Sequence, residues 1–217
     1  MKKNKNITSK EHVVLFVEGD TDLLFFNALL DWYRKTSSTP ILSCEVRNLQ
    51  GVSRYSSKVI GKIKNEINPI ANAKGLKIKA ICCSYDTDVF EASIPLNIDW
   101  KKMERDVIAL GIRCFCRIEV NCMIEDWLLD DIESICKFLK LKEIPTVCGN
   151  TGYQRIQSLF RKARKIYTKG LATQNMIKVL DFGKIRGRRL SSLSVLDEIL
   201  NVSIKLAYST IHENNFA

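Results

Sequence analysis

Short apolar segments alternate with amphipathic segments along the first part of the chain. Residues 13–17 form a continuous apolar run, typical of a strand buried on both faces of a parallel sheet. Similar runs predict strands over residues 41–46, 77–85 and 112–118. Because strands and helices alternate, the pattern predicts an α/β fold with a mostly parallel sheet and crossover helices.

Apolar side chains at helical spacing follow each predicted strand. We expect Asp20 or Thr21 to cap the first helix, since both have oxygens that accept from free backbone N–H groups. The four helical faces are Leu23, Phe26, Leu30 and Tyr33; Val52, Tyr55, Val59, Ile63 and Ile67; Trp100, Met103, Val107 and Leu110; and Met123, Ile124, Trp127 and Leu128 within residues 119–131.

The strand pattern fades beyond about residue 134 while helical spacing continues. We expect an α/β core over residues 1–133 and a basic, mainly helical region over residues 134–217 that packs on it. Ser191 or Ser192 is expected to cap the last helix. The two helical faces here are Tyr153, Ile156, Phe160, Ala163 and Tyr167, and Leu193, Leu196 and Leu200.

Composition is that of a globular protein, with 217 residues, 46% apolar and 27% charged. No apolar run is long enough to cross a bilayer and the first residues do not resemble a signal peptide, so we expect a cytoplasmic protein. The eight cysteines form no CxxC pair and only two histidines are present. Reduced, buried thiols are therefore the favoured interpretation, with zinc binding a minor alternative.

The net charge of +10 is concentrated in one segment. Residues 151–196 hold eleven basic residues and one acid, and the rest of the chain holds 23 of each sign. This imbalance indicates a polyanion, either nucleic acid or an acidic protein surface, although a solvated basic face is also consistent with it. Tyr153 and Tyr167 could stack on bases, but their spacing favours the core. The candidate phosphate contacts are Arg155, Arg161, Lys162, Arg164, Lys165, Lys169, Lys184, Arg186, Arg188 and Arg189.

Carboxylates follow three of the predicted strands. Glu18 follows the first, Asp86 and Asp88 follow the third, and Glu125 lies shortly after the fourth. Residues i and i+2 of an extended chain point the same way, so Asp86 and Asp88 could face one cation. Parallel strands place their carboxyl ends at one edge, where ligands of open α/β sheets bind, so these groups should converge. Clustered carboxylates repel one another unless a cation offsets them, and oxygen ligands suit Mg²⁺ or Mn²⁺. Such a metal can activate water against a phosphodiester, which predicts hydrolysis of that bond.

Each acidic motif also has a simpler interpretation. A single DxD is usually a turn or a helix cap, and EGDTD could merely begin a helix with acids that its dipole favours. Glu125, beside Trp127, could form only a surface salt bridge. The order of the two motifs, each closing an apolar strand, is more specific than either alone.

The segments VVLFVEGDTDLLFF and ICCSYDTDVF together resemble the Toprim domain of topoisomerases, primases and OLD-family nucleases, over roughly the first 130 residues. The resemblance implies a Toprim, Rossmann-like sheet in which Glu18 is an acid/base or metal ligand and Asp86 and Asp88 hold Mg²⁺. Asp22 occupies the last position of the EGxxD pattern of nuclease members. The segment IEDWLLDD resembles the Glu-containing helix of small stand-alone Toprim proteins, which supports Glu125 as a second-metal ligand. Lys184 is the best candidate for the family's late lysine.

The same resemblance implies a function. Topoisomerase and primase interpretations fit poorly, because no room remains for their additional domains. The chain has no GxxxxGK[ST] motif, so an ABC-type ATPase would be a separate protein, as in the PARIS phage-defence system, whose Toprim effector cleaves tRNA once released. We therefore expect a Mg²⁺-dependent endonuclease acting on tRNA or DNA in anti-phage defence, with a partner ATPase. A homodimer is possible.

Two other classes of function stay open. The chain could be a non-catalytic nucleic-acid- or protein-binding module that keeps the acidic cluster for its fold or for docking. It could also be a Rossmann-like phosphotransferase or phosphatase for small molecules, although the concentrated basic segment argues against that class.

Overall fold

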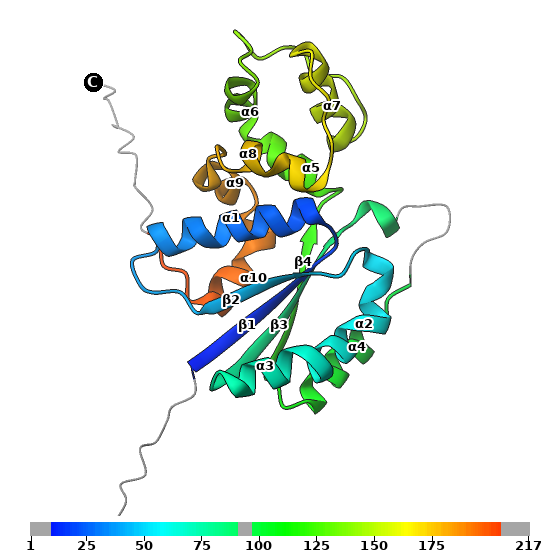
Figure 1. The fold of residues 1–217 in the computed structure, drawn as a ribbon, viewed down its shortest axis with the longest axis vertical. Coiled ribbons are helices and arrows are strands. Elements are labelled where there is room, and N and C mark those ends of the chain that lie inside the picture. The colour runs from blue at the N-terminus through cyan, green and yellow to red at the C-terminus, as the bar shows by residue number, and fades with distance from the viewer. Residues whose placement is uncertain (1–9, 91–96, 205–217) are drawn as a thin grey trace, which may run out of the picture.

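Four parallel strands form the centre of the fold. The computed structural model describes residues 10–90 and 97–204. The sheet order is β2-β1-β3-β4, and helices flank the sheet (Figure 1). The predicted α/β class is confirmed, and the architecture is consistent with a Rossmann- or Toprim-like fold. The strands are β1 Lys10–Val17, β2 Ser43–Asn48, β3 Leu76–Asp86 and β4 Cys114–Val120.

One face of the sheet is covered by three helices. Val14, Phe16, Ile81 and Cys83 point to this face and are fully buried. Opposite them lie the apolar sides of the helices, including the predicted Tyr55, Val59, Ile63 and Ile67. The helices are α2 Tyr55–Lys62, α3 Asn68–Ala73 and α4 Trp100–Ala109, with a 3-10 turn Val52–Arg54 before α2 and a π-helical turn Ile63–Ile67 between α2 and α3.

The other face carries α1 and the helices from the second half of the chain. Val13, Leu15 and Ile118 on the sheet share one apolar core with Phe25 of α1 and Trp127 of α5. This core continues across residue 133, and in Figure 1 helices α5 to α9 lie on the far side of α1 from the sheet. The division at residue 133 stays a prediction. The helices are α1 Asp20–Thr36, α5 Ile124–Leu128, α6 Ile132–Phe138, α7 Gly152–Lys162, α8 Gln174–Ile177, α9 Phe182–Arg188 and α10 Leu190–Leu200.

Two helix caps were predicted wrongly. Gly19 is the N-cap of α1, and neither Asp20 nor Thr21 caps it, because their side chains bond to Asn48 and to the Gly170 N–H instead. Arg189 occupies the N-cap of α10 in place of a serine, because α9 ends directly before it.

Two helix limits also differ from prediction. Residues 119–131 were expected to be helical, but β4 extends to Val120 and α5 begins only at Ile124. Glu119 continues the strand's alternation of buried and exposed side chains. Tyr167 was placed on the helix that contains Tyr153, yet α7 ends at Lys162 and Tyr167 reaches the core from the following segment.

The cysteines are all free thiols, as predicted. Five of them are buried, whereas Cys122 and Cys148 are exposed, so the expectation of burial holds only in part. Within residues 10–90 and 97–204, no helix has the length and apolar character needed to cross a membrane.

Candidate functional site

The carboxyl ends of β1 and β3 bring Glu18 and Asp86 together, as the sequence predicted. The two strands are neighbours in the sheet; Glu18 directly follows β1, and Asp86 is the last residue of β3. Glu18 Oε1 accepts a hydrogen bond from the Asp86 backbone N–H at 2.8 Å. The sheet itself therefore fixes the position of Glu18 beside Asp86.

A hollow of about 350 Å³, here called the rim hollow, opens beside these two residues. Four carboxylates line it, and Lys169 is the basic residue among its lining side chains. Asp22 enters from the first turn of α1 and is almost fully buried. The lining residues are Glu18, Gly19, Asp20, Thr21, Asp22, Gly51, Asp86, Ile124, Lys169 and Gly170.

Three carboxylates of the rim hollow, those of Glu18, Asp22 and Asp86, are poorly solvated and close to one another. Burial, with repulsion from neighbouring carboxylates, raises the pKa of Glu18 to about 7, of Asp22 to about 7 and of Asp86 to about 9. The positive charge of Lys169 opposes this rise in the pKa of Glu18 and Asp22. Asp22 Oδ1 and Asp86 Oδ1 are buried without a hydrogen-bond partner among the described residues. These oxygens are available to a ligand that carries positive charge.

Asp88 lies near the same carboxylates, but it is not on an extended strand with Asp86, although their two-residue spacing predicted this. The extended backbone of β3 ends at Asp86, and Asp88 begins a 3-10 helix, Asp88–Phe90. The premise that both aspartates belong to one extended segment is therefore wrong. Asp88 still contributes repulsion that raises the pKa of Glu18 and of Asp86, so it belongs to the same electrostatic cluster.

Glu125 is fully buried on α5, which excludes the surface salt bridge considered for it. The Tyr167 hydroxyl donates to Glu125 Oε1 at 3.2 Å, and the Lys169 ammonium lies 3.1 Å from the carboxylate. The same ammonium lies 5.1 Å from the centre of the Tyr153 ring. Glu125 therefore already contacts a cation, the Lys169 ammonium. Its predicted role was to bind a metal ion, and that prediction did not include a lysine contact.

Lys169 reaches the rim hollow on a segment that crosses the start of α1. The Gly170 N–H donates to Thr21 Oγ1 at 2.8 Å, which ties this segment next to Asp22. The sequence indicated Lys169 only as a phosphate contact, because nothing in its local pattern links it to residues about 150 positions earlier.

Lys184 lies away from the rim hollow. Its ammonium contacts Asp131 at 3.4 Å and also Glu133, both of which follow α5. Lys184 is not among the residues that line the hollow. Its catalytic role stays a prediction, and the position of Lys169 makes that residue the better candidate for a lysine that acts at the site.

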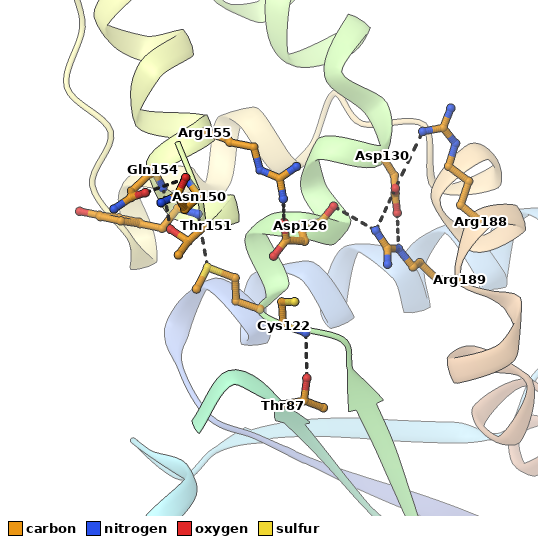
Figure 2. Close-up of polar contacts among 12 residues, drawn as sticks. Thr87, Cys122, Asp126, Asp130, Asn150, Thr151, Gln154, Arg155, Arg188 and Arg189 are labelled. Carbon is orange, nitrogen blue, oxygen red and sulfur yellow. Dashed lines mark hydrogen bonds and ion pairs between the residues drawn. The ribbon is translucent and has the colours of Figure 1, made fainter. Parts of the chain in front are cut away.

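Many of the basic side chains predicted to contact phosphate instead form ion pairs with carboxylates of the protein itself. Figure 2 shows Arg155 directed at Asp126, and Arg188 and Arg189 directed at Asp130. Arg186 pairs in the same manner with Asp197 at 2.7 Å. With Lys169 and Lys184, six of the ten candidates are therefore ion-paired.

The other four candidates form an exposed group at the end of α7, here called the α7 basic patch: Arg161, Lys162, Arg164 and Lys165. Across the described ranges none of these four forms an ion pair, although the Lys165 ammonium lies 5.6 Å from the centre of the Phe138 ring. The adjacent Ile166 is 88% exposed. This patch is the part of the basic segment most available to a polyanion.

Sequence reasoning missed the contribution of Tyr55. Its hydroxyl is fully buried within reach of two backbone carbonyls, those of Ser84 and, at 3.3 Å, Phe16. These carbonyls lie two residues before Asp86 and Glu18 respectively, so Tyr55 ties the ends of β1 and β3 together. A tyrosine inside the apolar face of a predicted helix was the available signal, because a buried hydroxyl needs a partner.

The donor set of the rim hollow fits a hard divalent cation. Its negatively charged candidate ligands are carboxylate oxygens, and two of these oxygens are buried with no hydrogen-bond partner among residues 10–90 and 97–204. In the described part of the chain, however, no three His, Cys, Asp or Glu side chains are already arranged to hold a metal ion. Binding would therefore require the carboxylates to reorient.

Comparison of this chain with models of protein families, with curated proteins and with solved structures found no match.

Proposed function

We propose that this protein is a Mg²⁺- or Mn²⁺-dependent nuclease that hydrolyses phosphodiester bonds at the rim hollow. The observation that carries the proposal is the gathering of Glu18, Asp22 and Asp86 around one opening, with Asp22 Oδ1 and Asp86 Oδ1 buried and without a hydrogen-bond partner in the described structure. Such a cluster is costly when ionised and becomes favourable when a cation joins it.

Each residue of the site has a role in this proposal. Asp86 and Asp22 would hold the cation, with Glu18 beside them and Asp88 adding negative charge. A bound divalent cation supplies Lewis-acid polarisation of the phosphodiester and a more acidic water molecule. Glu18, whose pKa is about 7 in the metal-free protein, lies beside the cation and is the proposed group that takes up or releases a proton. Lys169 is half exposed at the hollow and offsets negative charge there.

The substrate follows from the charge of the surface. The α7 basic patch suits the backbone of a nucleic acid, which lysine and arginine bind without regard to sequence. Transfer RNA and DNA are both compatible with this chemistry. A role as an anti-phage effector held by an ABC-type ATPase rests on the resemblance of the two acidic motifs to Toprim proteins.

The alternative proposal is a non-catalytic binding module with the same fold. Two observations favour it: Lys169 already contacts Glu125, and the carboxylates are not pre-arranged as a metal site within the described residues. In that case the internal lysine, rather than a metal, would balance the acidic cluster.

Incubation of the purified chain with tRNA and with plasmid DNA, in Mg²⁺, Mn²⁺ or EDTA, separates the two proposals. Asp86→Asn and Glu18→Gln keep the shape of each side chain but remove its charge. Glu104→Gln, an exposed acid on α4, is the matched control. The nuclease proposal expects metal-dependent cutting by the unaltered and control proteins and none by the two rim variants. Cutting that survives both rim substitutions rejects it.

A further inference from the structure

No strand among residues 10–90 and 97–204 covers the outer edge of β4. This strand ends the sheet on the side opposite β2, and among the described residues it pairs with β3 alone (Figure 1). Hollows of about 680 Å³ and about 590 Å³ adjoin β4, and Phe115 and Arg117 line both of them. Neither α4, which adjoins the first hollow, nor α10, which adjoins the second, therefore covers this edge.

The backbone direction along β4 identifies which residues face outward. The Thr87 N–H donates to the Val120 carbonyl at 3.0 Å, so Val120 turns its backbone groups toward β3. Along a parallel strand, successive residues turn these groups to opposite sides. Phe115, Arg117 and Glu119 therefore direct their N–H and C=O groups to the open edge, where a further strand could pair with them.

The side chains of Arg117 and Glu119 are exposed, carry opposite charges and lie on the same face of the strand. Both are held in place by aromatic neighbours. The Arg117 guanidinium lies 5.7 Å from the centre of the Trp100 ring, and Glu119 Oε1 accepts a hydrogen bond from the Tyr85 hydroxyl at 2.6 Å. The edge thus presents one fixed positive and one fixed negative charge two positions apart.

We propose that the β4 edge binds the β4 edge of a second copy of this chain, with the two strands antiparallel about a two-fold axis at Ile118. This axis places Arg117 opposite the partner subunit's Glu119, and symmetry repeats the contact. Both residues turn their backbone groups outward, so they form hydrogen-bonded pairs. The result is a continuous eight-stranded sheet across two copies of the four-stranded sheet.

The charge pattern favours this register, because an axis at Ile118 is the one that places the two charged residues of β4 opposite each other. An axis at Arg117 would oppose two arginines, and an axis at Glu119 would oppose two glutamates; like charges directly across two strands are unfavourable. Edge strands that avoid pairing usually carry charges that repel any second strand. Here the alternation of sign makes the edge complementary to itself, which favours a second copy over an unrelated strand.

Charge reversal tests the proposal through the oligomeric state. Sedimentation velocity over a range of concentrations should show a dimer for the unaltered chain, and Arg117→Glu or Glu119→Arg should weaken it by about tenfold or more. The double variant Arg117→Glu/Glu119→Arg restores opposite pairs and should restore the dimer. Arg105→Glu, an exposed change on α4, is the matched control and should leave it unchanged.

Amide hydrogen exchange on the unaltered chain gives a second readout that requires no folded variant. The N–H groups of Arg117 and Glu119 should exchange slowly at concentrations that favour the dimer and quickly on dilution, while that of Ile118 stays slow throughout. A monomer at all concentrations, a dimer that survives the single reversals, or fast exchange at Arg117 and Glu119 within the dimer overturns the proposal. These outcomes do not depend on whether the rim hollow is catalytic.

Discussion

At the scale of single residues, the rim carboxylates make the stability of the metal-free protein depend on pH. The pKa of Asp86 rises from 3.8 to about 9 in the folded protein, so the folded state binds protons more tightly than the unfolded state between these values. Stability from this group is present at low pH and is lost as the pH rises through about 9. Glu18 and Asp22 contribute a loss of stability of the same sign as the pH rises to about 7, because their pKa values are also raised.

We therefore predict that, in EDTA, the free energy of unfolding falls between about pH 7 and about pH 9, and that Asp86→Asn removes much of this fall. The measurement is denaturant unfolding at several pH values. At the upper end Asp86→Asn should melt higher than the unaltered protein, by roughly 2–4 °C for each ~1 kcal/mol gained. Mg²⁺ should reduce the difference between the two proteins. A stability that is flat in pH, or equal for both proteins, would contradict the placement of Asp86.

Lys169 gives the second prediction at this scale. Lys169→Met leaves the buried Glu125 without its cation, and because Lys169 is half exposed we expect a loss of only about 1–2 kcal/mol. Glu125→Gln in the same protein should recover part of the loss, giving a coupling of about 0.5–3 kcal/mol in a double-mutant cycle. Additive effects of the two substitutions would show that the ion pair contributes nothing.

The two halves of this site differ in how far the sequence predicts them. Glu18 and Asp86 could be placed together because each ends a recognisable apolar strand, and neighbouring parallel strands share an edge. The contact of Lys169 with Glu125 could not, because it depends on the path of the chain after α7. A local sequence pattern does not indicate which residues far apart in the sequence will be in contact.

At the scale of elements, α5 and the 3-10 turn Leu129–Asp131 after it are joined to later helices by carboxylate–arginine contacts and by close backbone packing. A Cβ atom on Gly152, the first residue of α7, would lie 2.7 Å from the Asp126 nitrogen, so only glycine fits there. Asp126 also forms an ion pair with Arg155, which lies on the next turn of α7. The start of α7 is thereby fixed against α5.

Asp130 gives the prediction for this scale, because it is buried and binds Arg189. Asp130→Asn should lower the free energy of unfolding by about 1–3 kcal/mol, since a charged hydrogen-bonded pair is replaced by a weaker one. Glu133→Gln is the matched control, because Glu133 is exposed and its pair with Lys184 should contribute less than about 1 kcal/mol. Urea unfolding measures both, and equal losses would contradict the difference in burial.

Strands and helical segments were predictable as elements, whereas their ends were not. The four strands follow from apolar runs, but the limits of α5 and α10 depend on neighbouring elements that local patterns do not contain. Glu119 belongs to β4 because the strand continues its pairing with β3, and Arg189 precedes α10 because α9 ends directly before it. Strand pairing and neighbouring elements therefore decide where these elements begin and end.

At the scale of the whole molecule, the basic excess of residues 151–196, eleven basic residues against one acid, overstates the surface available to a polyanion. Composition revealed the excess and its segment, but not that carboxylates of α5 and the residues after it neutralise much of it. Of the ten candidate phosphate contacts, the four of the α7 basic patch remain without ion pairs in the described part of the chain. Nucleic-acid binding should therefore depend on a small part of the basic segment.

We predict that replacing the four residues of the α7 basic patch with glutamine weakens nucleic-acid binding and lowers the slope of log K against log salt by up to about 3. Arg188→Gln, which alters an exposed arginine near Asp130, should change the slope by less than about 1. Fluorescence anisotropy with labelled tRNA and duplex DNA at several salt concentrations measures both. An unchanged slope in the fourfold variant would place the binding surface elsewhere.

The bond between Gly170 and Thr21 has a consequence for synthesis. A ribosome completes β1, β3 and β4, and with them the acidic edge, long before it adds Lys169. The nascent protein thus presents mutually repelling carboxylates whose balancing lysine is still untranslated. The pocket is therefore completed late in synthesis. A chain whose translation stops before Lys169 would contain the strands but would lack a complete site.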